Sequence, residues 1–172
     1  MSRLVFCAPM IVVMLASCAA SPPPQPISID VPFSDAGFAS WAGTGNANIQ
    51  GQAFLKTLGG DVKTCAGQDV SLIPDNAYSQ AMLFAIRQSG GILPPNVDPR
   101  VDGYMRTEKC DAQGNFSFNN IRSNKWLVLT RVLWFAPSEY GLNQQGGVLR
   151  RSITASPGEN RMILTGADEI AR

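Results

Sequence analysis

Residues 110–118, Cys-Asp-Ala-Gln-Gly-Asn-Phe-Ser-Phe, decide the fold class of this chain. Asp111 and Gly114 are turn-forming residues, and Phe116 and Phe118, two positions apart, point to one face of a strand. The residues that follow repeat this pattern, with strand-like runs separated by glycine, asparagine and proline. The segment therefore marks the start of the clearest β region.

Other short runs also have the alternation or the apolar content of β-strands. They lie at 48–55, 61–65, 68–73, 104–109, 115–121, 126–135, 147–155 and 160–165. The 16 Gly and 12 Pro of the 172-residue chain fit a turn-rich β protein, because each strand needs a bounding turn. The sequence thus predicts an all-β fold, in a chain long enough for one sizeable core.

Residues 126–135 are apolar on both faces apart from Thr130 and Arg131, which predicts a central strand buried on both sides. If 137–145 is the hairpin loop that follows, Arg131 falls roughly opposite Arg151. Like charges that face each other are unfavourable. We therefore expect either an acidic side chain nearby or a different register.

Residues 75–88 change from a period of two to a helical period. Tyr78, Ala81, Met82 and Ala85 form a helical stripe, and Asp75 is the candidate N-cap. Two glycines end the helix at 90–91, and the proline-containing segment 92–102 is then a loop. The simplest reading of the whole insertion, 75–102, is a helical lid over one end of the fold; a partner-binding helix is the alternative.

Residues 1–17 have the layout of a secretory signal, because Arg3 supplies a positive charge and the apolar run 4–16 is too short to span a bilayer. Residues 15–18, Leu-Ala-Ser-Cys, resemble the lipobox of bacterial lipoproteins, in which Cys18 becomes the acylated first residue. Acyl chains on Cys18 would attach the protein to a membrane, since each buried CH₂ contributes ~0.8 kcal/mol. The alternative is an ordinary signal peptide with an incidental cysteine.

Residues 18–26 are rich in proline and predict an extended tether of about 25 Å. Ala19 stands where enterobacterial lipoproteins retained at the inner membrane carry Asp, so the lipobox resemblance implies the outer membrane, on its periplasmic or its surface face. Residues 27–48 carry aromatic anchors and are expected to pack on the domain as an N-terminal extension. Residues 167–172 are the expected C-terminal tail.

Cys65 and Cys110 remain once the signal takes Cys7 and the lipid takes Cys18. In an oxidising compartment such a pair usually forms a disulfide, and closing a loop of about 45 residues contributes ~4 kcal/mol in the chain-entropy model. The alternatives are two independent buried thiols or a metal pair. A zinc site is disfavoured because the chain has no histidine and no CxxC spacing, and we expect neither a metal nor a cofactor.

Five segments, in this order, resemble the carboxypeptidase regulatory-like group of transthyretin-like (prealbumin-like) domains: 49–53, 66–72, 111–121, 126–129 and 156–164. They match the family's opening strand with its glycine, its "G, two residues, V, polar, L" strand, its "D, two residues, G, polar, F, polar, F" signature, the following aliphatic strand, and the closing turn with the last strand. The resemblance covers residues 49–166. It implies a seven-stranded, Ig-like β-sandwich of two sheets, here with one helical insertion.

Two enzyme groups share the transthyretin-like fold, and the sequence argues against both. Hydroxyisourate hydrolase requires catalytic histidines and a C-terminal Tyr-Arg-Gly-Ser, whereas this chain has no histidine and ends Glu-Ile-Ala-Arg. Intradiol dioxygenases bind iron through histidines and tyrosines. Because histidine is the commonest general base near neutral pH, its absence predicts a protein that is not an enzyme. A hydrolase with Ser or Asp chemistry is the third-ranked hypothesis.

The chain has 14 Lys and Arg against 13 Asp and Glu, and loss of the signal removes Arg3, so the mature surface is near neutral. A neutral surface disfavours nucleic acid as a partner. We expect a membrane-anchored module of the cell envelope that binds a protein or a glycan through the 75–102 insertion or the 137–145 loop. The alternative is an outer-membrane lipoprotein component of a secretion, conjugation or other envelope assembly.

Five basic residues form a candidate binding patch. Arg150 and Arg151, with Arg122, Lys125 and Arg131, form either a basic patch toward an anionic glycan or the scattered surface charge that is usual on β proteins.

Overall fold

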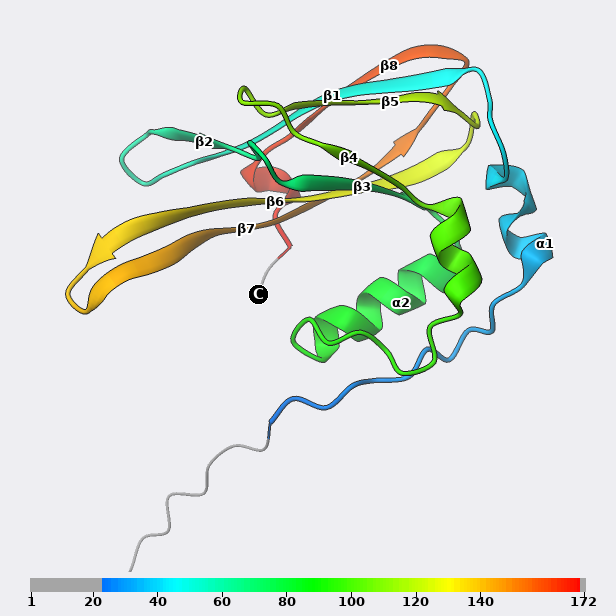
Figure 1. The fold of residues 1–172 in the computed structure, drawn as a ribbon, viewed down its shortest axis with the longest axis horizontal. Coiled ribbons are helices and arrows are strands. Elements are labelled where there is room, and N and C mark those ends of the chain that lie inside the picture. The colour runs from blue at the N-terminus through cyan, green and yellow to red at the C-terminus, as the bar shows by residue number, and fades with distance from the viewer. Residues whose placement is uncertain (1–22, 171–172) are drawn as a thin grey trace, which may run out of the picture.

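The computed structural model describes residues 23–170, so the predicted signal and Cys18 lie outside the described part of the chain. Figure 1 shows two layers of strands with helices beside them. The strands are β1 (Ala47–Lys56), β2 (Val62–Thr64), β3 (Asp69–Pro74), β4 (Arg106–Lys109), β5 (Asn115–Ile121), β6 (Lys125–Ser138), β7 (Gly141–Thr154) and β8 (Gly158–Leu164). The helices are α1 (Asp35–Phe38), α2 (Ala77–Gln88) and the short 3-10 helices η1 (Ala39–Trp41), η2 (Pro99–Tyr104) and η3 (Gly166–Asp168).

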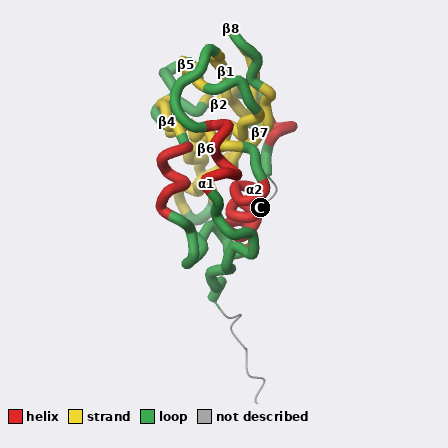
Figure 2. Tube along the Cα trace, turned by 90° about the vertical axis from the view of Figure 1, so that its right-hand side faces the viewer, coloured by secondary structure: helices red, strands yellow, loops and turns green. Residues whose placement is uncertain are grey.

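Two sheets form the layers. In the first sheet β1 pairs antiparallel with β2 and β5 and parallel with β8. The second sheet is antiparallel and has the order β4-β3-β6-β7. Seen from the side in Figure 2, the strands stack with α1 and α2 gathered toward one end. The expected all-β architecture of two packed sheets is confirmed, and the described residues contain eight strands where the resemblance implies seven.

The main core lies between the sheets and is built by the alternation of the strands. Phe116 and Phe118 are 5% and 2% exposed, and their ring centroids are 6.1 Å apart. Val70, Leu72 and Val128 belong to the same cluster and are fully buried. The prediction that Phe116 and Phe118 point to one face of a strand is therefore confirmed, and all five side chains share one core.

The turn before β5 forms as its residues dictate. The carboxylate of Asp111 accepts the backbone N–H groups of Gln113 at 2.9 Å and Asn115 at 2.8 Å. Gly114 has φ of +81°, and an added Cβ would lie 2.8 Å from the Ala53 carbonyl oxygen, so both conformation and space require glycine. Hydrogen bonds from the Asn115 side chain, together with these backbone bonds, lower the pKa of Asp111 below its ordinary value.

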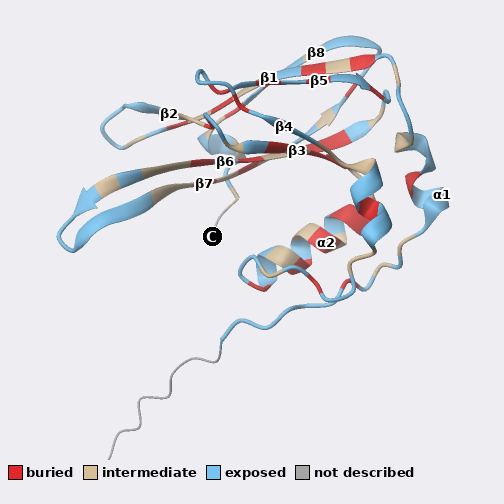
Figure 3. Cartoon of the chain, in the orientation of Figure 1, coloured by how far each residue is buried: buried red, intermediate tan, exposed pale blue. Residues whose placement is uncertain are grey.

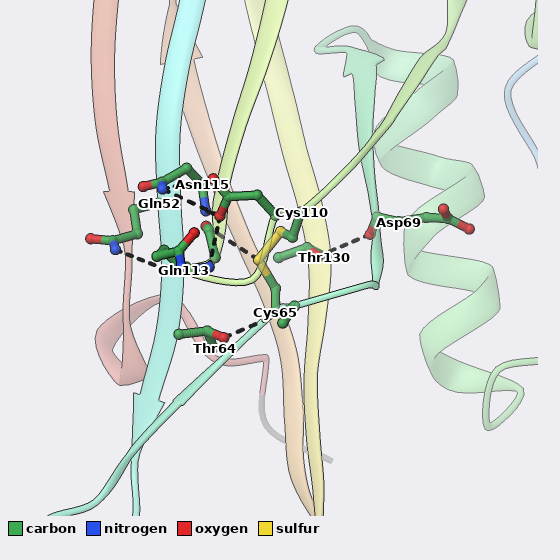
Figure 4. Close-up of a disulfide and its surroundings, with 11 residues drawn as sticks. Gln52, Thr64, Cys65, Asp69, Cys110, Gln113, Asn115 and Thr130 are labelled. Atoms are coloured by element: carbon green, nitrogen blue, oxygen red, sulfur yellow. Dashed lines mark hydrogen bonds between the residues drawn. A yellow bond between two sulfur atoms is a disulfide. The ribbon is translucent and has the colours of Figure 1, made fainter.

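Cys65 and Cys110 form a disulfide with Cα atoms 5.8 Å apart (Figure 4), so the predicted pairing is confirmed. Cys65 follows β2, where the chain leaves the first sheet, and Cys110 follows β4, where the chain returns to it. Backbone bonds flank the bridge: Cys65 N–H donates to Ala53 O at 3.1 Å, and Cys110 N–H donates to Gln68 O at 3.0 Å. The disulfide therefore links the β2–β3 crossing to the β4–β5 crossing between the sheets.

A second, smaller apolar cluster joins α2 to segments on either side of it in the sequence. Ile29 and Phe38 come from the N-terminal segment, Tyr78 and Met82 from α2, and Val101 from η2. The N-terminal segment is also tied to the insertion by Asn96, whose side chain exchanges hydrogen bonds with the backbone of Ile29 at 2.8 and 2.9 Å. Figure 3 shows buried positions along α2.

The outer face of the second sheet lies beneath α2. Ile73 and Leu127 are opposite each other in β3 and β6, and both point away from the main core, yet each is only 2% exposed. Figure 1 places α2 along this face. Within residues 23–170, no helix is both long enough and apolar enough to cross a membrane.

The helix begins one residue later than predicted. Asn76, not Asp75, is the N-cap, and its side-chain oxygen accepts the Ser79 N–H at 2.9 Å. Asp75 instead accepts hydrogen bonds from Gln80 at 2.6 Å and Ser152 at 2.9 Å, and lies 3.1 Å from Lys125. The sequence alone could not distinguish the two residues as the N-cap, because both aspartate and asparagine are good caps.

The expected 137–145 loop is also wrong. β6 and β7 remain paired as far as Ser138 and Gly141, so only two residues form the turn. Arg131 consequently faces Val148, while Arg150 faces Leu129 and Arg151 faces Val128. Between β6 and β7 no arginine lies directly opposite another, so a different register resolves the like-charge conflict.

Candidate functional site

The candidate site is a groove of about 800 Å³ between α2 and the outer face of β3, β6 and β7. We call it the α2 groove. α2 contributes Leu83, Ile86 and Arg87, the following loop contributes Gly90 and Gly91, and the strands contribute Ser71, Leu129, Arg131, Leu133, Val148 and Arg150. A volume of this order is typical of ligand sites, which occupy about 300–1,000 Å³. The groove brings together the helix of the insertion and the β6–β7 hairpin, the two features that the sequence singled out.

Strand alternation explains the lining. Leu129, Arg131 and Leu133 lie two residues apart on β6 and share the outer face, while Val128, Thr130 and Val132 turn inward. On β7 the cross-strand partners are Arg150 and Val148, which lie on the same outer face. The groove therefore continues along the sheet from the point where Ile73 and Leu127 are covered.

The end of α2 leaves the groove open. Ser89, which is buried, caps the helix by backbone donation to Ala85 O at 3.0 Å, and its hydroxyl lies 2.8 Å from both Ala85 O and Ile92 O. Gly90 and Gly91 follow with φ of +68° and +96°, a conformation that reverses the chain at low cost only for glycine. The helix therefore stops before it can cover the β6–β7 end of the sheet.

Charge in the groove is one-sided. Arg87, Arg131 and Arg150 line it together with a single carboxylate, that of Asp69. Asp69 lies 2.6 Å from the ammonium of Lys109, so its charge is already paired. Among the described residues, none of the three guanidinium groups forms an ion pair or a side-chain hydrogen bond.

An aromatic side chain stands at the hairpin end of the groove. Phe135 follows the same alternation as Leu133, faces Gln144 across the hairpin and is 67% exposed. Gln144 itself lines the groove. An exposed planar ring beside an amide is the type of surface on which ligands with mixed apolar and hydroxylated faces bind.

A second depression, of about 730 Å³ but more open, lies on the outer face of the first sheet. Gln50 and Gln52 of β1, Ser117 of β5 and Arg161 of β8 line it. Polar and apolar side chains line it about equally, and its Arg161 and Lys109 are accompanied by Glu108 and Asp111, whereas the α2 groove has three arginines and one carboxylate. We treat it as the control surface for the experiments below.

The predicted basic patch is divided by the structure. Arg131 and Arg150 meet in the α2 groove, but Arg151 lies on the opposite face, where it donates to Ile163 O at 2.8 Å and lies 3.6 Å from Asp168. Arg122 donates to Ala42 O at 2.8 Å, and Lys125 pairs with Asp75.

Arg87 was missed by the sequence reasoning. It comes just after the helical stripe in the sequence. Only the docking of α2 on the sheet places it beside Arg131 and Arg150, which are 44 or more positions away in the chain. No local pattern carries that information. Cys65 and Cys110 lie outside the groove, and in residues 23–170 no group of three or more His, Cys, Asp or Glu side chains is placed to hold a metal ion.

Arg100, in η2, forms an ion-pair network outside the α2 groove. Arg100 binds Asp98 at 2.8 Å and Asp35 at 2.7 Å, and its guanidinium lies 4.4 Å from the centre of the Phe33 ring. These contacts join the insertion to the N-terminal segment. The hydrogen bonds from Arg100 lower the pKa of Asp98 below its ordinary value.

No protein-family model matches the chain, and no curated protein matches it. Among solved structures, the fold is similar to a crystal structure from Pseudomonas aeruginosa that is described as a "putative carbohydrate binding protein". The two chains are 25% identical with a TM-score of 0.67, and the similarity covers 79% of this chain and 99% of the other. The two proteins therefore share one fold over most of this chain.

Proposed function

We propose that this protein is a carbohydrate-binding module of the bacterial cell envelope and that the α2 groove is its binding site. The observation that carries the proposal is the groove itself, which combines apolar side chains and free arginines, with the exposed Phe135 next along the same strand face. The fold similarity to a protein described as carbohydrate-binding supports the class of ligand. Fold alone does not determine function, so the site must carry the argument.

The proposal includes attachment to a membrane through an acylated Cys18, with residues 18–26 as the tether and the outer membrane as the location. It also includes a transthyretin-like relationship, with a helical insertion, and a binding role without catalysis. The lipobox-like residues 15–18, the ordered family-like segments and the absence of histidine support these parts. Intact mass of the protein extracted from membranes tests the attachment, because a lipidated chain begins at Cys18 and carries the added acyl mass.

A second candidate function, a protein contact within an envelope assembly, is favoured by one observation. The turns of two hairpins carry large exposed apolar side chains, namely Leu58 and Val62 near the β1–β2 turn and Tyr140 and Leu142 at the β6–β7 turn. Figure 1 shows both hairpins extending to the same side of the sandwich. Such residues on one side of a protein are typical of an interaction surface.

The test of the carbohydrate proposal is a binding panel of envelope and model polysaccharides, run on the purified full-length protein and two matched variants. Ser71→Phe places a ring in the α2 groove, and Ser117→Phe places the same ring in the depression on the first sheet. Both serines are outward-facing strand residues, so both variants should keep the melting temperature of the wild type.

We expect at least one polysaccharide to bind the wild type and Ser117→Phe, and to be lost in Ser71→Phe. Loss in Ser117→Phe with retention in Ser71→Phe would move the site to the first sheet. If no polysaccharide binds the wild type, the carbohydrate function is wrong. Co-purification of a stable envelope assembly that depends on Tyr140 and Leu142 would then favour the second candidate.

A further inference from the structure

The three arginines of the α2 groove come from three separate elements. Arg87 is in the last turn of α2, Arg131 is in β6 and Arg150 is in β7. Because Arg131 faces Val148 and Arg150 faces Leu129, the two strand arginines are diagonal neighbours on one face of the sheet. The fold thus gathers three positive charges on one concave surface.

These charges contrast with those of four other arginines in the described chain. Arg100 and Arg151 lie near carboxylates, and Arg106 and Arg122 donate to backbone carbonyls. The groove arginines have no such partners between residues 23 and 170. The one carboxylate in the groove, Asp69, is held by Lys109.

Like charges on neighbouring positions of a sheet repel each other, and the repulsion opposes folding. The position of Arg87 near the C-terminus of a helix is favourable in itself. In residues 23–170, Arg131 and Arg150 have no ion pair and no side-chain hydrogen bond to stabilise them. An anionic ligand would offset the repulsion, and the planar fork of arginine matches the two oxygens of a carboxylate, phosphate or sulfate group.

The remaining lining argues for a ligand larger than a free ion. Leu83, Ile86, Leu129 and Leu133 supply apolar surface between the charged groups, and the groove has a volume of about 800 Å³. A sugar ring has apolar C–H faces and a polar rim, so a glycan that carries acidic groups meets both parts of this surface.

From this geometry we infer that the α2 groove binds an anionic glycan, with Arg87, Arg131 and Arg150 as the groups that contact its acidic substituents. The inference rests on the proposed carbohydrate function and adds the charge class of the ligand. Binding is selective for acidic over neutral glycans, and salt weakens it because the arginines are open to solvent.

The experiment uses oligogalacturonate and its fully methyl-esterified form, which share one sugar backbone and differ in charge. Binding to the full-length protein is measured for the wild type, Arg131→Gln, Arg150→Gln and the control Arg161→Gln. Arg161 is exposed on β8 in the other depression and, among the described residues, likewise has no acidic partner. A sulfated dextran and unmodified dextran form a second matched pair, which separates carboxylate from sulfate recognition, and inorganic phosphate serves as a competitor.

We expect an acidic oligomer to bind at least tenfold more tightly than its neutral counterpart, and each groove variant to weaken it about tenfold, since hydrogen bonds to charged groups are among the strongest. Arg161→Gln should leave binding unchanged.

Equal binding of charged and neutral oligomers, blocked by Ser71→Phe, would overturn the charge class while the carbohydrate function stands. The charge class would also be overturned if Arg161→Gln weakened binding of the acidic oligomer as much as the groove variants do. The same holds if inorganic phosphate displaced the bound oligomer at the concentration at which free oligomer displaces it. Absence of all glycan binding would remove the proposed function as well.

Discussion

The carboxylate of Asp75 lies 3.1 Å from the ammonium of Lys125, and only 4% of the Asp75 side chain is exposed. Burial by itself would raise the pKa of Asp75, but hydrogen bonds from Gln80, Lys125 and Ser152 outweigh it and leave the pKa below its ordinary value of 3.8. Asp75 connects the start of α2 to β6 and β7. The pair therefore fixes the helix that forms one wall of the α2 groove.

Because the folded state lowers this pKa, ionised Asp75 stabilises the protein above its ordinary pKa, and the contribution is lost as the pH falls through the folded value. We expect the free energy of unfolding to decrease below about pH 4. Asp75→Asn should cost roughly 1–3 kcal/mol at pH 7 and should reduce the acid dependence. Some dependence should remain, since Asp98 and Asp111 also have lowered pKa values. Urea unfolding between pH 3 and pH 7 measures both effects, and an unchanged acid slope in the variant would contradict them.

Ser79 should be replaceable with a gain in stability. Its hydroxyl oxygen is buried in α2 and has no hydrogen-bond partner among the described residues. Ser79→Ala removes an unsatisfied polar atom, and alanine has a higher helix propensity than serine. We therefore expect the free energy of unfolding to rise by about 1 kcal/mol. The matched control is Ser89→Ala, where the hydroxyl is bonded to backbone carbonyls and its loss should destabilise the protein. Melting temperatures that move in the same direction in both variants would refute the assignment.

Gly51 is required by packing. An added Cβ would overlap the ring of Phe116, which is held in the core against Phe118. We expect Gly51→Ala to cost about 1–3 kcal/mol through overpacking. Gly103→Ala is the control, because nothing lies within 4 Å of its added Cβ and its φ is not positive. Denaturant titration of the two variants should show a large effect only at Gly51.

The disulfide should contribute substantially to stability. Cys65 and Cys110 close a loop with a sequence separation of 45, for which the chain-entropy model gives ~4 kcal/mol. We expect a reductant to lower the unfolding midpoint of the wild type and to leave that of Cys65→Ala/Cys110→Ala unchanged. A wild type whose midpoint does not respond to complete reduction would show that the bond adds little.

Much of the fold was predictable because its signals are local. The alternation around Phe116 and Phe118 located β5, and the helical stripe that includes Tyr78 and Met82 located α2. The length of the β6–β7 hairpin was not predictable in this way, because Pro137 and the glycines after it are usually turn signals. Beyond Thr130, β6 no longer pairs with β3, so the missing N–H of Pro137 falls on an open edge where proline is tolerated.

The candidate site was only half visible in the sequence. The insertion and the hairpin were both singled out, but as separate surfaces. Their meeting in one groove depends on how α2 docks on the sheet. The diagonal placement of Arg131 and Arg150 depends on the β6–β7 register, and the expected loop at 137–145 predicted a different register. Long-range packing, which no short motif encodes, supplies these relationships.

The most direct test of the central claim is to map amide chemical shifts in the full-length protein during titration with a glycan that binds it. Binding in the α2 groove predicts the largest changes at Gly90 and Gly91 of the helix end and at Val148 and Arg150 of β7. Changes concentrated instead at Gln50, Gln52 and Ser117 would place the ligand on the first sheet and contradict the account.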